Sequence, residues 1–505
     1  MANHLFLVLL VPLLAATVSA IICQQRIWVR VITIAATLFS LGYSTWLLVM
    51  IPSAGRMVAQ AGGWVAPFGI TLIADGLSAL MLFLTALLTL ATVLFSFATI
   101  DENRERFYYY PLLLLLLFGC SGAFLTGDLF NLYVWFEILL VASFGLITLG
   151  GSRGQLEGGL KYMALNLFGS TCFLVGAGLV YGVAGTLNMA HLAERLSTVQ
   201  DPSLVTAVAG FFLIAFGSKA ALAPLFFWLP TSYHTPSIAV TALFGGLLSK
   251  IGIYALYRIF GTVFQNELPR LAPLILVVAG VTMVVGVIGA MAQINVRRIL
   301  AFHIVSQVGY MAMGLGLASV AGMTAGILFL AHNIIVKTAL FLVGGAAEHI
   351  SGTGELKQMG GMARREPLLA TLWLLASFAL VGIPPLSGFF GKLGLVQAGV
   401  AGEQWLIVAV AAFVSLFTLF SMLKIWNEVF WKKAYSDQSQ LPPARSGLIM
   451  PAALLVAFSI AMGFGAAPTF EYSRMAAEQI FDIASLVRDV CGPNGCDAVE
   501  LAVSR

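Results

Sequence analysis

The sequence predicts an all-α polytopic membrane protein, and three observations support this fold class. Of the 505 residues, 60% are hydrophobic and only 10% are charged. Mean hydropathy is +0.97, far above the range of soluble domains. Apolar runs of about twenty residues, the length of a membrane-crossing helix, follow one another with short polar breaks. We therefore expect one continuous helical bundle. The small net charge of +4 gives no case for nucleic acid binding.

The apolar runs predict fourteen membrane-spanning helices. They are expected near residues 3–22, 30–50, 70–98, 109–127, 129–150, 162–183, 205–229, 237–260, 271–292, 299–317, 321–346, 369–393, 402–430 and 446–467. The first run could also be a secretory signal, because it is apolar and ends in small residues. Only His4 precedes it, and the positively charged start of a signal is missing. We expect a retained first helix.

The distribution of Lys and Arg predicts that both termini lie outside the cytoplasm. Loops on one side hold fourteen basic residues, namely Arg26, Arg30, Arg104, Arg106, Arg153, Lys161, Arg297, Arg298, Lys357, Arg364, Arg365, Lys432, Lys433 and Arg445. Loops on the other side hold four, namely Arg56, Arg195, Arg258 and Arg270. Cytoplasmic loops carry the excess of basic residues. Arg474, Arg488 and Arg505 in the tail weaken this bias without reversing it.

The cysteines fall into two groups. Cys23, Cys120 and Cys172 lie in or beside apolar spans, where a small buried side chain is the simple interpretation. Cys491 and Cys496 flank GPNG, a tight-turn sequence, in a tail that faces an oxidising compartment under this topology. We hypothesise a local disulfide, the alternative being two free thiols on a frayed end.

The stretch from Phe211 to Pro230 carries the main functional signal. Lys219 lies near the middle of an apolar span, and Pro224 breaks the helix just after it. A buried ammonium is costly and is a functional candidate by default. A proline frees backbone carbonyls that only protein or water can satisfy. A second break, at Pro384 and Pro385, precedes Lys392 by about two helical turns.

Five lysines lie within predicted spans: Lys219, Lys250, Lys337, Lys392 and Lys424. They outnumber the buried acids that could neutralise them. Burial disfavours the charged form of a lysine, so exchange of protons is the more economical interpretation. Glu137 is the expected counter-charge of Lys219. The pair could be a structural clamp or a switch, and the switch also accounts for the proline and the other lysines.

Further polar residues extend this set. Lys250 shares a helix face with Tyr254 and Tyr257, and Asn333 precedes Lys337 by four residues. His332 adds a group that titrates near neutral pH. His303 has Ser306 and Gln307 on its own face and could equally be a satisfied packing residue. Candidates of second rank are His303, Asp75, which interface solvation could explain, and Lys424 and Glu428, which could simply pair with each other.

The two breaks predict an internal repeat. Each falls in the fourth helix of a five-helix unit, and an odd number of spans inverts one unit relative to the other. We expect N-terminal helices in 1–100, a first repeat in 101–262, a second in 263–432, a last helix in 433–470 and an extracytoplasmic tail in 471–505. No nucleotide loop, thiolate cluster, haem motif or metal site is recognisable, so we expect no cofactor.

Four segments of the chain resemble one family, the antiporter-like membrane subunits shared by respiratory complex I and the Mrp cation/proton antiporters. They read SKAALAPLFFWLPTSYHTPS, RILAFHIVSQVGYMAMGLG, HNIIVKTALFL and GIPPLSGFFGKLGL. The form LPTSYHTPS and the lysine at 392 look like the D-type member of the Mrp family, where some complex I relatives carry LPDAHxxAP and Glu. The absence of a long amphipathic C-terminal extension argues against the largest relatives.

The resemblance implies fourteen helices, inverted five-helix repeats and a central polar axis. It marks Glu137 and Lys219 as an ion-pair switch, Lys250, His332 and Lys337 as a relay, and Lys392 as the terminal group. It implies a multi-pass protein of the cell membrane, in contact with lipid, that works with the A, B, C, E, F and G types of Mrp protein and couples proton influx to efflux of Na+ or K+. Two alternatives remain: a proton-pumping subunit of complex I or a membrane-bound hydrogenase, and a non-transporting scaffold.

Overall fold

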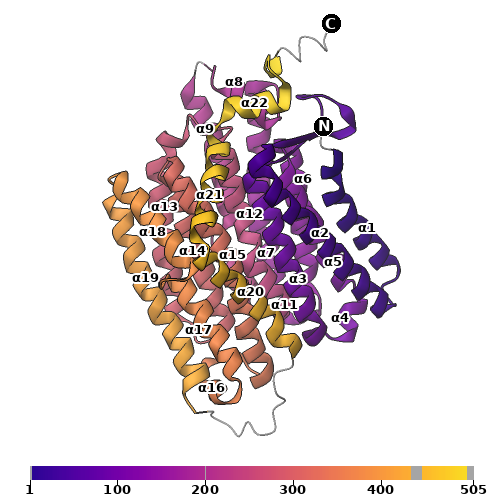
Figure 1. Ribbon diagram of the computed structural model, residues 1–505, viewed down its shortest axis with the longest axis vertical. Helices are drawn as coiled ribbons and strands as arrows, with labels where there is room; N and C mark the ends of the chain where they lie inside the picture. The colour runs from indigo at the N-terminus through magenta and orange to yellow at the C-terminus, as the bar shows by residue number, and fades with distance from the viewer. Residues whose placement is uncertain (1–2, 200, 434–445, 498–505) are drawn as a thin grey trace.

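The computed structural model describes residues 3–199, 201–433 and 446–497, and most of them lie in helices (Figure 1). The α-helices of the N-terminal half are α1 (Leu7–Ile21), α2 (Arg26–Ala54), α3 (Gly76–Thr99), α4 (Glu102–Arg106), α5 (Tyr109–Leu125), α6 (Leu129–Thr148), α7 (Arg153–Ala184), α8 (Met189–Leu196), α9 (Pro202–Ala220), α10 (Trp228–Ser232), α11 (Ile238–Gly246) and α12 (Leu248–Gly261). Those of the C-terminal half are α13 (Leu268–Ala292), α14 (Val296–Gly316), α15 (Val320–Ser351), α16 (Met362–Arg365), α17 (Pro367–Val381), α18 (Ser387–Ala401), α19 (Trp405–Ile425), α20 (Ser446–Phe464), α21 (Ala466–Phe481) and α22 (Ile483–Cys491).

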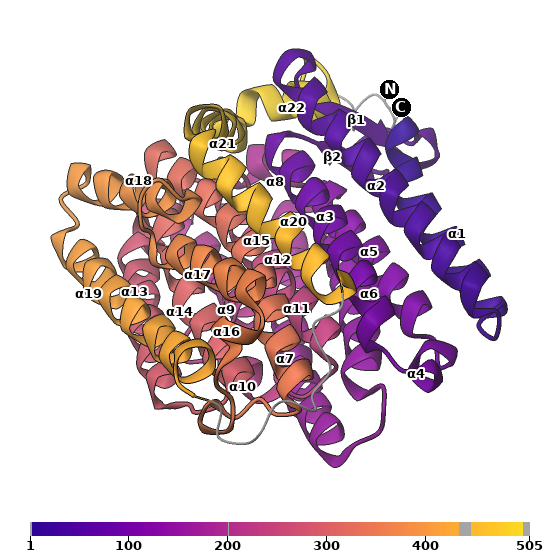
Figure 2. The ribbon, with the colours of Figure 1, turned by 60° about the horizontal axis from the view of Figure 1, so that its bottom comes forward.

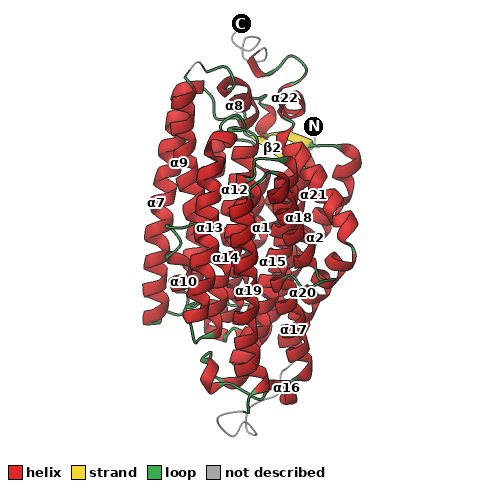
Figure 3. Cartoon of the chain, turned by 90° about the vertical axis from the view of Figure 1, so that its left-hand side faces the viewer, coloured by secondary structure: helices red, strands yellow, loops and turns green. Residues whose placement is uncertain are grey.

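The remaining elements are short. Three are 3-10 helices, η1 (Asn3–Phe6), η2 (Ala61–Gly63) and η3 (Leu356–Gln358), and η4 (Trp426–Trp431) is a π-helical end of α19. Strands β1 (Met57–Gln60) and β2 (Thr71–Ala74) form an antiparallel hairpin that pairs Met57 with Ala74. Figure 3 shows how little of the chain is strand.

Twelve helical segments of the described residues are long and apolar enough to cross a membrane, which confirms the all-α polytopic class. Two more, α5 and α17, are apolar but have only 17 and 15 residues. Each of the fourteen expected spans overlaps one of these fourteen segments. Because two of the segments are short, the count of fourteen stays a prediction.

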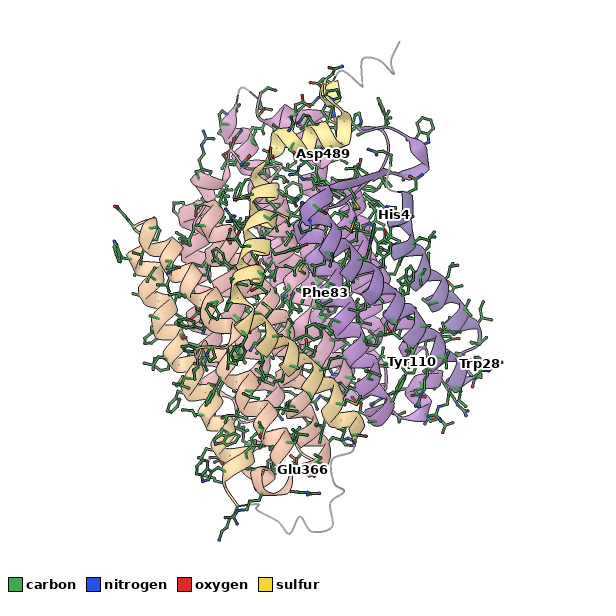
Figure 4. All side chains as sticks on the ribbon, in the orientation of Figure 1. His4, Trp28, Phe83, Tyr110, Glu366 and Asp489 are labelled. Atoms are coloured by element: carbon green, nitrogen blue, oxygen red, sulfur yellow. A yellow bond between two sulfur atoms is a disulfide. The ribbon has the colours of Figure 1, made fainter. Side chains whose placement is uncertain are left out.

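The bundle has two ends that differ in composition. One end, called the cap end here, carries the β1–β2 hairpin, α8 and α22, together with the start of α1 (Figure 1). The opposite end carries α4 and α16, whose short sequences ENRER and MARR are rich in arginine, and it is called the basic end. Figure 4 labels Asp489 at the cap end and Glu366 at the basic end.

Helix α15 runs through the centre of the bundle. Its membrane-spanning window is entirely buried inside the protein, and it packs against α11, α14, α18 and α20. In Figure 2, α20 crosses over α15 and lies beside α3. By contrast, α1, α2 and α19 bury only a third of their windows and lie at the two flanks (Figure 1). Polar residues on α15 are therefore held away from lipid.

Two expected spans are interrupted near the middle of the bundle. The span at 205–229 ends as α9 at Ala220, and Ala221 is left-handed before the cis peptide that precedes Pro224. The span at 369–393 ends as α17 at Val381, and Gly382 is left-handed before the cis peptide that joins Pro384 to Pro385. Each break leaves the carbonyls of the preceding helix end without intrahelical partners.

The cap end is held together by residues far apart in sequence. Arg56, beside β1, donates to Ser485 and to the backbone carbonyls of Gln479 and Asp482. Asp497 accepts from His191 at 2.8 Å and from Arg195 at 2.9 Å, which ties the tail to α8. Cys491 and Cys496 form the hypothesised disulfide, and Cys496 is buried.

Removing this disulfide is expected to loosen the cap locally. In the chain-entropy model, a cross-link that closes so short a loop raises the free energy of the open state by about 2 kcal/mol. A Cys491→Ser/Cys496→Ser variant should show faster backbone amide exchange in α22 by hydrogen–deuterium mass spectrometry, with unchanged exchange in α15. Cys23→Ser, which removes a free cysteine, is the control. Unchanged exchange in α22 would show that Arg56 and Asp497 hold the cap without the disulfide.

Candidate functional site

Polar side chains from six helices form a row across the bundle, which is called the polar row here. Glu137 on α6 is half-buried, and the other members are buried: Lys219 on α9, Lys250 on α12, His332 and Lys337 on α15, His303 on α14 and Lys392 on α18. The row contains all the first-rank residues proposed from the sequence.

Lys219 lies in the last turn of α9 and is 5% exposed. Its Nζ donates to Ser170 Oγ of α7 at 2.9 Å and lies 5.0 Å from the centre of the Phe136 ring. Glu137 is close enough to act on Lys219 electrostatically. The two do not touch, since no salt bridge within 4.0 Å joins them and Glu137 Oε1 has no hydrogen-bond partner among the described residues. The expected ion pair is therefore an interaction through space.

Lys250 lies just after the junction of α11 and α12. Its Nζ donates to the carbonyl of Gly245 at 2.5 Å. The tyrosines that share its helix face bond elsewhere, Tyr254 to the carbonyl of Phe124 and Tyr257 to that of Met311, both at 2.8 Å. The expected tyrosine neighbours of Lys250 are therefore not its hydrogen-bond partners. Gly252 lets the backbone of α9 at Lys219 approach α12 closely.

The α15 part of the row is rich in polar atoms without protein partners. In the described chain, Lys337 Nζ, both amide atoms of Asn333 and His332 Nε2 are buried and unpaired. His332 Nδ1 bonds to Ser387 Oγ at 2.8 Å, and Ser387 bonds to Ser459. Buried polar groups are almost always satisfied, and water does this where protein does not. The α15 segment is therefore the part of the row with unused hydrogen-bonding capacity among the described residues.

Lys392 and His303 complete the row. Lys392 Nζ donates to the carbonyl of Val381 at 2.8 Å and to Ser415 Oγ at 2.9 Å, and it lies 5.0 Å from the Tyr310 ring centre. His303 Nε2 bonds to Ser421 on α19 at 2.8 Å. The expectation that Ser306 and Gln307 satisfy His303 is wrong, because their side-chain atoms have no partner in the described chain.

Lys219, Lys250 and Lys392 share one feature. Each lies in, or binds to, the C-terminal end of a helix. Lys219 is in the last turn of α9, Lys250 bonds to a carbonyl of the last turns of α11, and Lys392 bonds to the last carbonyl of α17. The C-terminal end of a helix carries a partial negative charge. Interrupted membrane helices use such ends to hold cations. The breaks therefore provide counter-charge for ammonium groups without a carboxylate.

Two second-rank expectations are corrected by the structure, and the first concerns Asp75. This residue is 1% exposed, so interface solvation does not explain it. It caps α3 through Ser78 and forms a bidentate ion pair with Arg258, which lies inside α12 and not in a loop as expected.

Lys424 and Glu428 do not pair with each other either. Lys424 donates to the carbonyls of Met291 and Gln293, while Glu428 pairs with Lys432. Glu428 lies in the π-helical segment that begins at Trp426, whereas Lys424 lies before that segment.

Two cavities lie along the first half of the row. A vestibule of about 330 Å³ opens at the basic end between α7, α10 and α14, and its lining includes Lys161, His234 and Arg298. A small cavity of about 30 Å³ adjoins Lys219 and is lined by Tyr162, Asn166 and Trp228 among others. Burial, followed by the charge of Arg298, lowers the pKa of His234 to about 4, so this imidazole is neutral at pH 7.

One face of α7 runs past both cavities. Gly158 lines the vestibule, Tyr162 and Asn166 line the small cavity, and Ser170 bonds to Lys219. These residues recur every four positions, which places them on one helix face. Sequence reasoning missed this polar face of α7, although its spacing could have revealed it.

The chain is similar throughout its length to proteins of one family. The family model described as NADH:quinone oxidoreductase/Mrp antiporter, TM, matches residues 126–418. A relative from Alkalihalophilus pseudofirmus, named as the D-type subunit of an Na(+)/H(+) antiporter, is 46% identical over 392 residues, which are 78% of this chain and 80% of the relative.

Solved structures give the same result. A chain in the Mrp complex from Dietzia sp. has a TM-score of 0.92 at 34% identity, with 97% of this chain and 100% of that chain covered. A chain of the membrane-bound sulfane sulfur reductase, an archaeal respiratory membrane complex, has a TM-score of 0.89 at 28% identity and the same coverage. The chain therefore belongs to the NADH:quinone oxidoreductase/Mrp antiporter family of membrane subunits.

Proposed function

We propose that this chain is the proton-translocating D-type subunit of a multi-subunit Na+(K+)/H+ antiporter. The observation that carries the proposal is the polar row, in which titratable side chains follow one another from Glu137 to Lys392 inside the bundle. Ionisable residues buried at membrane depth mark ion pathways and proton relays. The name of the Alkalihalophilus relative supports antiport, and it makes the chain part of a transporter and not an enzyme.

In the proposed mechanism, each proton transfer changes a charge that the next group feels. A proton that neutralises Glu137 removes the negative charge acting on Lys219. Lys250 comes next in the proposed order, because its helix α12 packs against α9. Lys337 lies within electrostatic reach of both Lys250 and Lys392, so it links the two halves of the row. His332 and His303 adjoin this last step, since Lys337 and Lys392 both act on them.

We propose that protons reach Lys219 from the vestibule along the polar face of α7. The vestibule is wide enough for water, and the cavity at Lys219 has room for about one water molecule. Asn166 donates to the carbonyl of Tyr162, which leaves its side-chain oxygen free to accept. Water bound there would bridge the vestibule and the Ser170 hydroxyl that faces Lys219.

The row suits protons better than alkali cations. Ammonium groups repel Na+ and K+ in a low-dielectric interior, and no carboxylate touches Lys219 or Lys392 in the described residues. We therefore place the cation path at a boundary with another subunit. The partners we propose are the other Mrp proteins, of the A, B, C, E, F and G types.

We propose that the chain lies in the cell membrane with the cap end outside. The excess of basic residues in loops of one side supports this orientation, and the disulfide at the cap end fits an oxidising compartment. The two interrupted helices support inverted repeats in 101–262 and 263–432, with helices 1–100 before them and 433–470 and the 471–505 tail after them.

The second candidate function is a proton-pumping subunit of a redox complex, such as complex I or a membrane-bound hydrogenase. The similarity to a chain of the sulfane sulfur reductase supports it. Both functions use the same row, so they differ in the process to which proton movement is coupled, which is cation exchange in one case and electron transfer in the other.

Reconstitution of the purified intact complex into liposomes tests the proposal. With an imposed inside-acid pH gradient, addition of Na+ or K+ should dissipate the gradient, while choline should not. Liposomes with a complex purified from cells lacking this chain are the control. The second candidate would be favoured over antiport if neither cation dissipated the gradient and the complex moved protons during quinone- or hydrogen-linked electron transfer.

A further inference from the structure

We propose that Tyr254, Arg258, Asp75 and Ser78 form a seal between Lys250 and the cap end. Because of the seal, a proton leaves Lys250 toward Lys337 on α15 and not toward the cap end. The seal serves the relay of the proposed function and rests on it. The name "seal" denotes these four residues below.

The seal begins one helical turn from Lys250, on the side of the cap end. Lys250, Tyr254 and Arg258 follow one another at four-residue intervals along α12, which places them on one face that leads from the middle of the bundle toward the cap end. Asp75 and Ser78, at the start of α3, meet this face at Arg258. A proton leaving Lys250 along its own helix would have to pass these residues.

The polar groups of the seal bond mainly to one another. Every guanidinium nitrogen of Arg258 is used: two bind the Asp75 carboxylate, one of these also binds Ser78 Oγ at 3.0 Å, and the third donates to Tyr254 Oη at 3.3 Å. The Tyr254 hydroxyl also donates to the carbonyl of Phe124. Arg258 is 6% exposed and Asp75 1% exposed. Little remains for water to bind, so the seal is dry.

The buried polar groups of α12 itself and of α14 and α15, which pack against it, show the opposite pattern. Ser249 Oγ, Lys337 Nζ, Asn333 and Gln307 are buried, and their side-chain polar atoms lack partners in the described part of the chain. Because buried polar groups require a partner, water is expected among them. The wet direction from Lys250 is therefore lateral, toward α15, and the dry direction is outward.

The ion pair of the seal also does not titrate near neutral pH. A guanidinium is not deprotonated in proteins. Burial opposes ionisation of Asp75, but the charge of Arg258 outweighs it and lowers the pKa of Asp75 to about 2. At neutral pH both partners keep their protonation state, and neither can pass a proton on.

The C-terminal helix α21 closes over the seal. Gln479 accepts from the backbone N–H of Gly76 at 2.8 Å, and Tyr472 donates to the Gly76 carbonyl at 3.2 Å. A Cβ at Gly76 would clash with Met475 and Ala476, so α21 lies directly on the start of α3. This packing keeps water of the cap end away from Asp75.

The test measures passive proton leak in liposomes that contain the intact complex, with choline as the sole cation. The variant Asp75→Asn/Arg258→Gln replaces the ion pair by two amides of similar size, whose unused donors and acceptors recruit water. We expect the rate of the leak to rise about tenfold, because the barrier to outward transfer falls. Tyr254→Phe removes only a hydroxyl, and it gives the result by itself should the amide pair fail to assemble.

The control is a matched ion pair at the basic end. Arg297 and Glu348 also form a bidentate pair, and Arg297→Gln/Glu348→Gln should leave the leak unchanged. Adding Lys250→Met to the leaky variant should remove the leak, because its source is gone. An assembled variant as tight as the wild type would overturn the seal, as would a leak that survives Lys250→Met. A failure of the proposed function would be seen in a different measurement, because liposomes with the wild-type complex would then show no cation-driven proton exchange.

Discussion

A Lys219→Met complex is expected to assemble normally and to lose cation-driven proton exchange by about a hundredfold or more, the usual cost of removing a proton-transfer group. Methionine keeps the length and apolar body of the side chain, so the contact with Phe136 and the end of α9 are preserved. The variant has no proton to exchange. Ser170 then loses its ammonium donor, and the proposed path along α7 ends without an acceptor.

Exchange would be measured in membrane vesicles with a pH-sensitive dye, and assembly by native electrophoresis. Lys357→Met, at an exposed lysine outside the row, is the control and should behave as wild type. Glu137→Gln should give a loss similar to that of Lys219→Met, because the amide keeps the shape of the side chain and removes its charge. A Lys219→Met complex with full exchange would contradict the relay and favour a scaffold.

The sequence is enough to find the residues of the row, since a charge within an apolar run is visible in one dimension. Lys219 beside Pro224, and Lys392 after Pro384 and Pro385, are recognisable in this way. The all-α class follows from the same apolar runs and is confirmed by the membrane-length helices and by the family.

The partners of these residues could not be predicted, for physical reasons. Lys250 and Lys392 bind backbone carbonyls, which every residue carries, so no side-chain pattern indicates which carbonyl is free. The ion pair of Asp75 and Arg258 joins residues 183 positions apart, and only the tertiary fold brings the start of α3 to this part of α12. Four-residue spacing misleads at Lys424, because its ammonium binds two backbone carbonyls at the end of α13 and not Glu428.

Replacing Lys392 by Met distinguishes a relay from a scaffold in the second half of the row. Lys392 is on α18, yet its ammonium reaches back across the break to the last carbonyl of α17. In a scaffold this contact would only tie the two helix segments together, and Ser415, which also donates to that carbonyl, would keep it partly satisfied. A scaffold should therefore tolerate the methionine.

In a relay, Lys392→Met should reduce exchange by about a hundredfold or more while assembly is unchanged. Ser415→Ala should cost far less, because it removes one hydrogen bond to the ammonium and leaves the titrating group in place. Lys392→Glu should not restore exchange, since a carboxylate placed against the negative end of α17 has no donor for the Val381 carbonyl unless it is protonated. The three variants thus form an ordered series, with Ser415→Ala active and both Lys392 variants inactive. Equal exchange in all three, measured in the same vesicle assay, would remove Lys392 from the proton path and leave it as a structural link between α17 and α18.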